Sequence, residues 1–304
     1  MPELPEVETT VRGLNAKVRG LEIVDSWTNY NSPFHKENSN IKNPKFFSIF
    51  KKQIKEKKIL RAERRAKNIL IHIEGGRTIL IHMKMTGHIL YGSYLYNKKE
   101  NAWQATENGP LQDPFNQFIR FVLVLSNKKH LVLSDMRKFA KVTLLDTSTL
   151  TEAIELKHLG PEPLSRDFTV KEFSQRILRK PLGNIKSVLM NQTVISGIGN
   201  IYSDEILWAS GIHPESKPKN LSSSHIKKMF QNTQTILKQG IDFNGDSMSD
   251  YRTIDGTPGA FQHHHNAYRR TNKPCTKRGC KGVIQRKIIG ERSAHFCSVH
   301  QKRY

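Results

Sequence analysis

Cysteine is scarce in this chain: its 304 residues include only three, and all three follow position 270. They are too few and too clustered for the disulfide framework of a secreted domain, so we expect a reducing compartment, the cytoplasm. The N-terminus is acidic and lacks the apolar core of a signal peptide. No apolar run approaches the roughly 20 residues that a membrane span requires, which argues against a membrane protein.

Acidic residues are also scarce relative to basic ones. The chain has 27 Asp and Glu against 49 Lys and Arg, which gives a formal net charge of +22. Such an excess points to a polyanionic partner, most often nucleic acid, although a generally lysine-rich composition would explain part of it. Hydrophobic residues at 37% suffice for a globular core, and the length favours two or more domains.

The spacing of apolar residues changes along the chain. Helical spacing over 5–18 gives way to strand patterns from about 22 to 146, with hairpins at 69–83 and 118–133 and polar surface loops at 28–45 and 94–116. Helical patterns return at 170–178, 184–191, 200–209 and 224–239, and residues 242–262 lose periodicity. These patterns predict an α+β multidomain protein with an antiparallel β-sandwich and flanking helix, a helical domain and a short Cys-bearing tail.

The first residues combine an amine nucleophile with two carboxyls. Removal of Met1 would leave Pro2 as a secondary amine, and an α-amino group has a pKa of roughly 7.7–8, so that a useful fraction is unprotonated near neutral pH. Amines form Schiff bases with carbonyl-level carbons, and that of a secondary amine is a charged iminium. Glu3 and Glu6 could supply acid–base chemistry. Alternatively, these residues simply begin a helix.

Two close pairs of potential metal ligands lie near the C-terminus. Cys275-x4-Cys280 and Cys297-x2-His300 are separated by sixteen residues, which is enough for a β-hairpin. This spacing predicts one structural zinc ion bound by three cysteines and one histidine, with the metal stabilising a tail too short for its own core. The alternatives are three incidental thiols, or His295 as the fourth ligand.

Three further motifs are weaker. The run Gly197-Ile198-Gly199-Asn200 precedes a helical pattern and suits either a phosphate contact or a tight interhelical turn. Arg137 and Phe139 follow one predicted hairpin and Met85 follows another, and side chains of these types could insert into a base stack. Alternatively, Phe139 is a core residue and Arg137 a solvated charge. Residues 251–261 have the composition of a flexible loop.

Taken in order, these motifs resemble the Fpg/Nei family of base-excision-repair enzymes, and in particular its bacterial formamidopyrimidine-DNA glycosylase branch. The resemblance spans nearly the whole chain. The matching motifs are M-P-E-L-P-E-V-E-T at 1–9, R-R-A-K at 64–67, I-H-M-K-M-T-G at 81–87, D-M-R-K-F at 135–139, L-G-P-E-P-L at 159–164, I-S-G-I-G-N-I-Y-S-D-E at 195–205, A-S-G-I-H-P at 209–214 and D-G-T-P-G-A-F at 255–261.

The resemblance implies catalytic roles at the N-terminus. Pro2, freed of Met1, would attack C1′ of the damaged nucleotide, and Glu3 would act as the acid–base residue. Glu6 would support the terminal amine, and Lys67 would contact DNA next to the lesion.

The resemblance also implies a set of DNA contacts. Met85, Arg137 and Phe139 would fill the gap left by a flipped base, with Arg137 facing the orphaned cytosine. Phosphate contacts are implied for four residues: Lys138, Lys186, Asn200 and Arg292.

The implied function is removal of oxidised purines, 8-oxoguanine and formamidopyrimidines, followed by strand cleavage by β,δ-elimination. The implied partner is double-stranded DNA with oxidised bases or abasic sites, bound by a monomer in a bacterial cytoplasm, at the nucleoid. The expected domains are a catalytic β-sandwich at 1–150, a helix–two-turn–helix domain with a lesion-capping loop at 151–262, and a zinc-finger hairpin at 263–304.

Several positions depart from the family pattern. The finger of the family is usually Cys₄ rather than Cys₃His, Met136 replaces a proline, and Lys84 stands where glycine is usual. Two other functions stay open: a Nei-type glycosylase for oxidised pyrimidines, and a non-catalytic zinc-finger DNA-binding protein. Leu4 and the 255–261 motif favour the purine branch.

Overall fold

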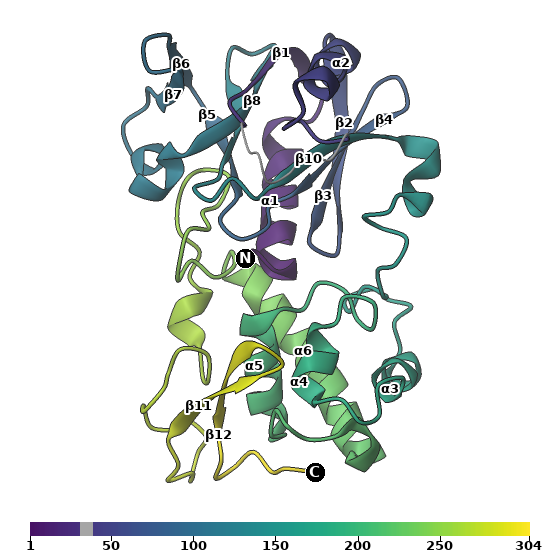
Figure 1. Ribbon diagram of the computed structural model, residues 1–304. Coiled ribbons are helices and arrows are strands. Elements are labelled where there is room, and N and C mark those ends of the chain that lie inside the picture. Colours follow the sequence, from purple (N-terminus) through teal and green to yellow (C-terminus); the bar gives the residue numbers. More distant parts are fainter. Residues whose placement is uncertain (31–38) are drawn as a thin grey trace. The chain divides into compact units, whose positions relative to one another are not determined.

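The computed structural model of the protein describes residues 1–30 and 39–304 (Figure 1). The predicted loop at 28–45 therefore lies partly outside the described residues. By internal packing the chain forms two compact units: Met1–Leu156 with Phe243–Ala260, and Lys157–Asp242 with Phe261–Tyr304. Among the helices of the described ranges, none is both long and apolar enough to cross a bilayer.

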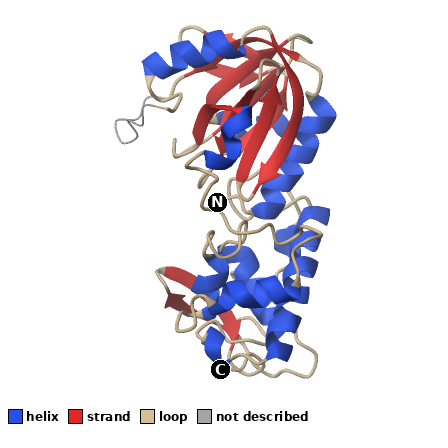
Figure 2. Ribbon diagram, turned by 90° about the vertical axis from the view of Figure 1, so that its right-hand side faces the viewer, coloured by secondary structure: helices blue, strands red, loops and turns tan. Residues whose placement is uncertain are grey.

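The first unit is built on an eight-stranded antiparallel sheet in the order β10-β4-β3-β2-β1-β8-β9-β5. Figure 2 shows strands of this sheet in red. β1 and β2 join its two halves through only two residue pairs, Glu22 with Lys58 and Ile23 with Lys57. Both halves contribute to one core, as the predicted β-sandwich requires. The strands are β1 (Glu22–Thr28), β2 (Lys57–Arg65), β3 (Asn68–Ile73), β4 (Arg77–His82), β5 (His88–Gly92), β8 (Ile119–Leu125), β9 (His130–Ser134) and β10 (Lys141–Asp146), and the 3-10 helix η3 (Thr147–Glu152) follows.

Two helices complete this core. α1 (Leu4–Lys17) buries Val7, Val11 and Leu14, whose spacing predicted it. α2 (Pro44–Ile54) lies where the sequence predicted strand and loop, so that prediction was wrong. The side chain of Asn43 accepts hydrogen bonds from the first backbone N–H groups of α2, and Pro44 starts its first turn, which are the usual signals of a helix N-terminus.

The outer face of β5, β8 and β9 is buried as well. Residues that alternate with those of the main core, such as Val122 and Val132, form a second apolar cluster with Tyr94 and Leu111. The segment that covers this face was predicted to be a polar loop at 94–116, which was wrong. It forms β6 (Tyr94–Asn97), β7 (Ala102–Ala105) and the 3-10 helices η1 (Pro110–Gln112) and η2 (Pro114–Gln117).

The second unit is helical, with a β-hairpin near its end, as predicted. Its helices are α3 (Val170–Leu178), α4 (Ile185–Met190), α5 (Asn200–Ser210) and α6 (Ser223–Asp242), with 3-10 turns η4 (Pro218–Asn220) and η5 (Phe261–His264). β11 (Ile284–Ile289) pairs with β12 (Arg292–Cys297). Together the two units form the predicted mixed α+β architecture.

The domain boundaries predicted near 150 and 262 stay predictions. By packing, residues 243–260 group with the first unit, and residues 261–304 group with the helices of the second. The first grouping follows from hydrogen bonds to α1, including that from the Tyr251 hydroxyl to the Glu6 carbonyl at 3.1 Å.

Candidate functional site

The N-terminus of α1 gathers three predicted catalytic residues in a buried position. Pro2, Glu3 and Glu6 are all buried. Glu3 and Glu6 form a reciprocal capping box, in which the Glu3 backbone N–H donates to Glu6 Oε2 at 2.7 Å. The acids therefore do begin a helix, as the alternative interpretation held, and that same helix fixes both carboxyls beside Pro2.

Residues 243–260 contact this cluster from the other side. The backbone N–H of Asp246 donates to Glu6 Oε1 at 2.8 Å, so each carboxylate oxygen of Glu6 has a backbone donor. Gly245 has φ +85°, and a Cβ there would lie 2.8 Å from Glu6 Cγ. Glycine at this position thus permits both the backbone conformation and the close approach.

The α-amino group of Met1, which precedes Pro2 in the structure, lies in a charged but poorly solvated environment. Burial lowers its pKa below the ordinary value, and the positive charge of Lys67 acts in the same direction, whereas Glu3, Glu6 and Asp250 oppose the shift. Lys67 follows β2 and is itself buried. The charges of Glu3, Glu6 and Lys67 thus all act at the start of the chain, beside the buried Pro2.

The loops after β4 and β9 hold the predicted wedge residues. Arg137 and Phe139 are exposed, and the Arg137 guanidinium lies over the Phe139 ring, 4.5 Å from its centroid. This excludes the alternative that Phe139 is a core residue. Met85 is half-buried on the neighbouring loop, and the Arg137 N–H donates to Thr86 Oγ1 at 3.1 Å, which places the two loops side by side.

A buried carboxylate fixes the wedge loop. Asp135 accepts hydrogen bonds from the Thr86 hydroxyl at 2.6 Å, the Tyr30 hydroxyl at 2.9 Å and the Ala140 N–H at 2.8 Å. Lys138 adopts φ 57°, and its carbonyl accepts from Lys42 Nζ at 2.9 Å. The exposed side chains thus project from a backbone that is held in place.

A basic pocket of about 350 Å³, which the sequence interpretation missed, lies near these loops. It is lined by Lys42, His82, Lys84 and Phe139, among others. Burial and the charges of Lys84 and Lys67 lower the pKa of His82 to about 3, so His82 is neutral at pH 7. Its Nδ1 accepts from the Lys84 N–H at 3.0 Å, which leaves the proton on Nε2 as a donor. The I-H-M-K motif at 81–84, which contains His82 and Lys84, was the sequence signal that could have indicated this pocket.

In the second unit, the glycine-rich run forms the start of α5. Gly197 has φ 87°, Gly199 is the N-cap, and Asn200 is the first helical residue. The Asn200 Oδ1 atom is buried and has no hydrogen-bond partner among the described residues. A helix N-terminus favours anions, so Asn200 lies where a phosphate would be stabilised.

Lys186 differs from the prediction. Its side chain is fully buried in α4, and its ammonium forms an ion pair with Asp204 and a hydrogen bond to Ser203 Oγ at 3.3 Å. A buried lysine with these partners presents no donor to an external phosphate. The sequence could not reveal this because the partner lies on another helix, α5.

Two carboxylates of α5 attach the C-terminal segment to the helices. Asp204 Oδ2 accepts from the His295 N–H at 2.9 Å and lies 3.0 Å from His295 Nδ1. Glu205 accepts three backbone N–H groups, from Asn266, Ala267 and Tyr268, at 2.8–2.9 Å. His295 is thereby engaged with Asp204, which argues against its candidacy as a metal ligand.

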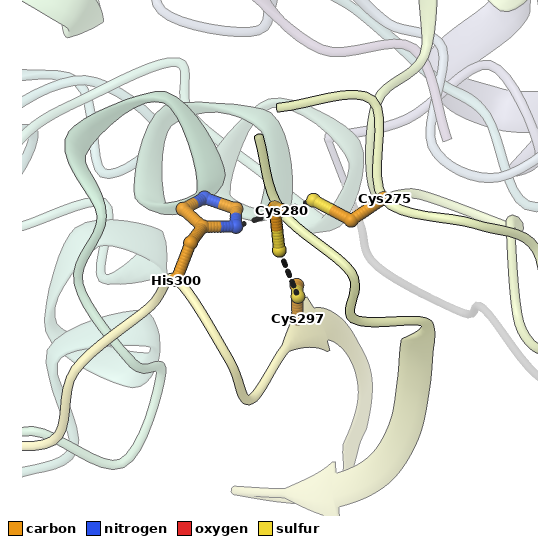
Figure 3. Close-up of side chains that lie close together, drawn as sticks. All are labelled: Cys275, Cys280, Cys297 and His300. Atoms are coloured by element: carbon orange, nitrogen blue, oxygen red, sulfur yellow. Dashed lines mark hydrogen bonds between the residues drawn. The ribbon is translucent and has the colours of Figure 1, made fainter. Parts of the chain in front are cut away.

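The predicted ligands Cys275, Cys280, Cys297 and His300 converge (Figure 3). Their ligand atoms all lie within 4.8 Å of one another, with Cys280 Sγ 3.6 Å from Cys297 Sγ. A tetrahedral zinc with Zn–S bonds of about 2.3 Å needs sulfurs about 3.8 Å apart, so the donor set fits a zinc ion. His300 Nε2–H donates to the Trp208 carbonyl at 3.0 Å, which turns an unprotonated Nδ1 toward the sulfurs.

Arg292 lies at the tip of the β11–β12 hairpin and is exposed. The two-residue turn, Gly290 with φ 54° and Glu291 with φ 62°, has the positive φ values of a type I′ turn. The hairpin therefore presents Arg292 to solvent, away from the metal ligands at its other end.

Comparisons with known proteins define the class to which this fold and site belong. Residues 1–142 match the model of the formamidopyrimidine-DNA glycosylase N-terminal domain, and residues 159–252 match that of the formamidopyrimidine-DNA glycosylase H2TH domain. The chain therefore belongs to the formamidopyrimidine-DNA glycosylase family, a family of DNA repair glycosylases.

Individual relatives match over their full length. The chain is 34% identical to the formamidopyrimidine-DNA glycosylase of Herpetosiphon aurantiacus, over 99% of this chain and 100% of that one. It is 36% identical to that of Pelotomaculum thermopropionicum, over 99% of each. Among solved structures, Lactococcus lactis Fpg bound to abasic-site DNA matches with a TM-score of 0.82 and 28% identity, over 99% of this chain and 100% of that chain. A Lactococcus lactis Fpg mutant bound to Fapy-dG DNA matches with the same TM-score, identity and coverage.

Proposed function

We propose that this protein removes oxidised purines from double-stranded DNA and then cleaves the strand as an abasic-site lyase. The observation that carries the proposal is the N-terminal cluster, in which Pro2 is buried beside Glu3 and Glu6 at the start of α1. The similar solved structures of Lactococcus lactis Fpg contain abasic-site or Fapy-dG DNA, which supports the same substrates here.

The reaction begins when Met1 has been removed. The Pro2 nitrogen forms a bond to C1′ of the damaged nucleotide as the bond from C1′ to the base breaks, and the base leaves with the electron pair and a proton. Glu3 donates a proton to the sugar ring oxygen so that the ring opens and the charged iminium forms. Glu6, held by two backbone donors, stabilises the amine while it is protonated.

The iminium is an electron sink for strand cleavage. It makes the C2′ proton acidic, and loss of that proton expels the 3′ phosphate. A second elimination expels the 5′ phosphate and completes the β,δ-elimination. Lys67 stabilises the departing phosphates through its positive charge.

The remaining residues hold a distorted duplex. The target base must leave the stack before the amine can reach C1′, and Arg137, Phe139 and Met85 fill the space that it vacates. Arg137 carries donors suited to the orphaned base. Phosphates are contacted by Lys138, Asn200, Arg292 and the neutral Nε2–H of His82. Lys186 contacts no phosphate, because its ammonium is buried in an ion pair with Asp204.

The metal ligands would hold one structural zinc ion. When bound, it would join the chain before the hairpin to the chain after it. A hairpin of this size buries few apolar residues and needs such a link to stay folded. Cys275 and Cys280 precede the hairpin, and Cys297 and His300 end it. The bound metal would thus position Arg292 for a phosphate.

Incision assays on four duplexes test this function. They contain 8-oxoguanine opposite cytosine, a formamidopyrimidine, thymine glycol, or an abasic site. We expect release of both purine lesions and cleavage at the abasic site by the wild type, and loss of all three with Pro2→Gly. Preference for thymine glycol would move the protein to the Nei-type branch, and no product from Met1-free protein would leave a non-catalytic DNA-binding protein.

A further inference from the structure

The 107–117 segment of the first unit, hereafter the buttress, packs against the loop that contacts the N-terminal site. It follows β7 and contains η1 and η2. Leu111 anchors it in the apolar cluster on the outer face of β5, β8 and β9. Because the buttress rests on a sheet, it is a rigid support for whatever it contacts.

One contact is an ion pair with the 243–260 loop. Arg252 Nε lies 3.1 Å from Asp113 Oδ2, and the two side chains are 8% and 25% exposed. The guanidinium also lies over the Phe115 ring, 4.6 Å from its centroid. Through Nη1 it donates to the carbonyl of Ser249 at 3.0 Å and to that of Tyr251 at 2.9 Å. The buttress thus holds Arg252, and Arg252 holds the backbone of the loop tip.

A second contact is made by a buried amide. Asn116 Nδ2 donates to the carbonyls of Pro110 at 2.8 Å and Gly256 at 3.1 Å. Its Oδ1 accepts from His88 Nε2 at 2.9 Å, so all three groups orient the amide. Gly256 has φ +84°, and a Cβ there would lie 2.8 Å from the Pro110 backbone, which shows how closely loop and buttress approach.

The other end of the loop is fixed to α1 through Glu6. Between the two anchors lies the tip 248–250, in which Met248 is 41% exposed. Asp246 and Tyr251, on either side of the tip, both bond to Glu6 beside Pro2, so the tip lies near the proposed nucleophile, the Pro2 amine. A base attached to a C1′ atom at that amine would therefore lie against the tip.

We propose that the buttress positions the 243–260 loop for substrates that still carry a base. This rests on the proposed function. Asp113, Phe115 and Asn116 are positioning residues that act through Arg252 and Gly256. An abasic site has no base to hold, so its cleavage needs the amine and Glu3 but not an ordered tip. Loosening the buttress should therefore slow base excision more than abasic-site cleavage.

The test compares full-length wild type with Asp113→Asn and Gly256→Ala. Asparagine at 113 still accepts from the Phe115 N–H, which keeps the cap of η2, but it loses the charge that pairs with Arg252. Two variants serve as controls. Glu100→Gln removes an exposed carboxylate elsewhere in residues 94–117. Gly20→Ala replaces a glycine with φ +83° and open space around it.

Hydrogen exchange of residues 246–256 is the first readout, and we expect exchange about tenfold faster in Asp113→Asn and Gly256→Ala but not in either control. The second readout is single-turnover kinetics. We expect 8-oxoguanine excision to fall about tenfold, with abasic-site cleavage within about twofold of wild type.

Two results would overturn the inference: unchanged exchange in both Asp113→Asn and Gly256→Ala, or equal losses on both substrates. If the wild type releases no oxidised purine, the proposed function fails, but the exchange measurement still decides whether the buttress orders the loop.

Discussion

The buried ion pair of Lys186 and Asp204 allows the sharpest test of the second unit. The Lys186 and Asp204 side chains are 0% and 1% exposed. Asp204→Asn removes the negative charge and leaves a buried ammonium with neutral acceptors alone: the new amide oxygen, Ser203 Oγ at 3.3 Å and the Asn200 carbonyl at 3.4 Å. Removing one partner of a buried pair costs about 3–5 kcal/mol of unfolding free energy.

Lys186→Met should cost less. Without the lysine, Asp204 keeps two donors from His295, so its charge is not left unsolvated. The double variant Lys186→Met/Asp204→Asn should be more stable than Asp204→Asn alone, because no unpaired charge remains. The control is Glu172→Gln, which weakens a half-exposed pair with Arg176 in the same unit and should cost at most about 0.5 kcal/mol.

These differences in unfolding free energy are measured by urea unfolding, with hydrogen exchange of α5 as the probe. With a slope of about 2 kcal/mol per molar urea, the midpoint for Asp204→Asn should fall by about 1.5–2.5 M. The reasoning is refuted if Asp204→Asn behaves like Glu172→Gln. It is also refuted if Lys186→Met leaves stability intact and lowers the salt dependence of DNA binding by about one counterion, since Lys186 would then be a phosphate ligand.

Three further predictions follow from the sites. Chelation of the metal, or His300→Ala, should unfold the β11–β12 hairpin and weaken DNA binding while circular dichroism of the first unit's sheet persists; full activity of metal-free protein would exclude a zinc role. Lesion-duplex affinity should fall steeply with salt, and Arg292→Ala should reduce the slope of log K against log salt by about one. Burial lowers the pKa of His88 to about 4, so stability that is present above about pH 6.5 should be lost as pH falls toward 4. Over this pH range the wild type should lose roughly 3 kcal/mol more unfolding free energy than His88→Gln. Equal losses in the two proteins would show that His88 is solvated.

Much of the fold could be predicted because its signals are local. The helix at 5–18, both hairpins and the four later helices differ from the structure by one or a few residues at their ends. The convergence of Cys275, Cys280, Cys297 and His300 was also predictable, since ligand spacing is a local property.

Other features depended on long-range contacts that no local pattern reveals. Residues 94–116 look polar, yet Tyr94 and Leu111 pack on a sheet face formed by β5, β8 and β9. Lys186 matched a phosphate-binding position, but its ion pair with Asp204 is decided by how α4 packs on α5. The grouping of 243–260 with the first unit likewise depends on Glu6, about 240 positions earlier.

The central claim is that Pro2 is the nucleophile, and borohydride trapping tests it most directly. Protein confirmed to lack Met1 is incubated with a duplex bearing 8-oxoguanine opposite cytosine, and in parallel with a thymine-glycol duplex. We predict a covalent adduct on the first duplex that peptide mapping places at Pro2. An adduct at another residue, or none on either duplex, would contradict the account.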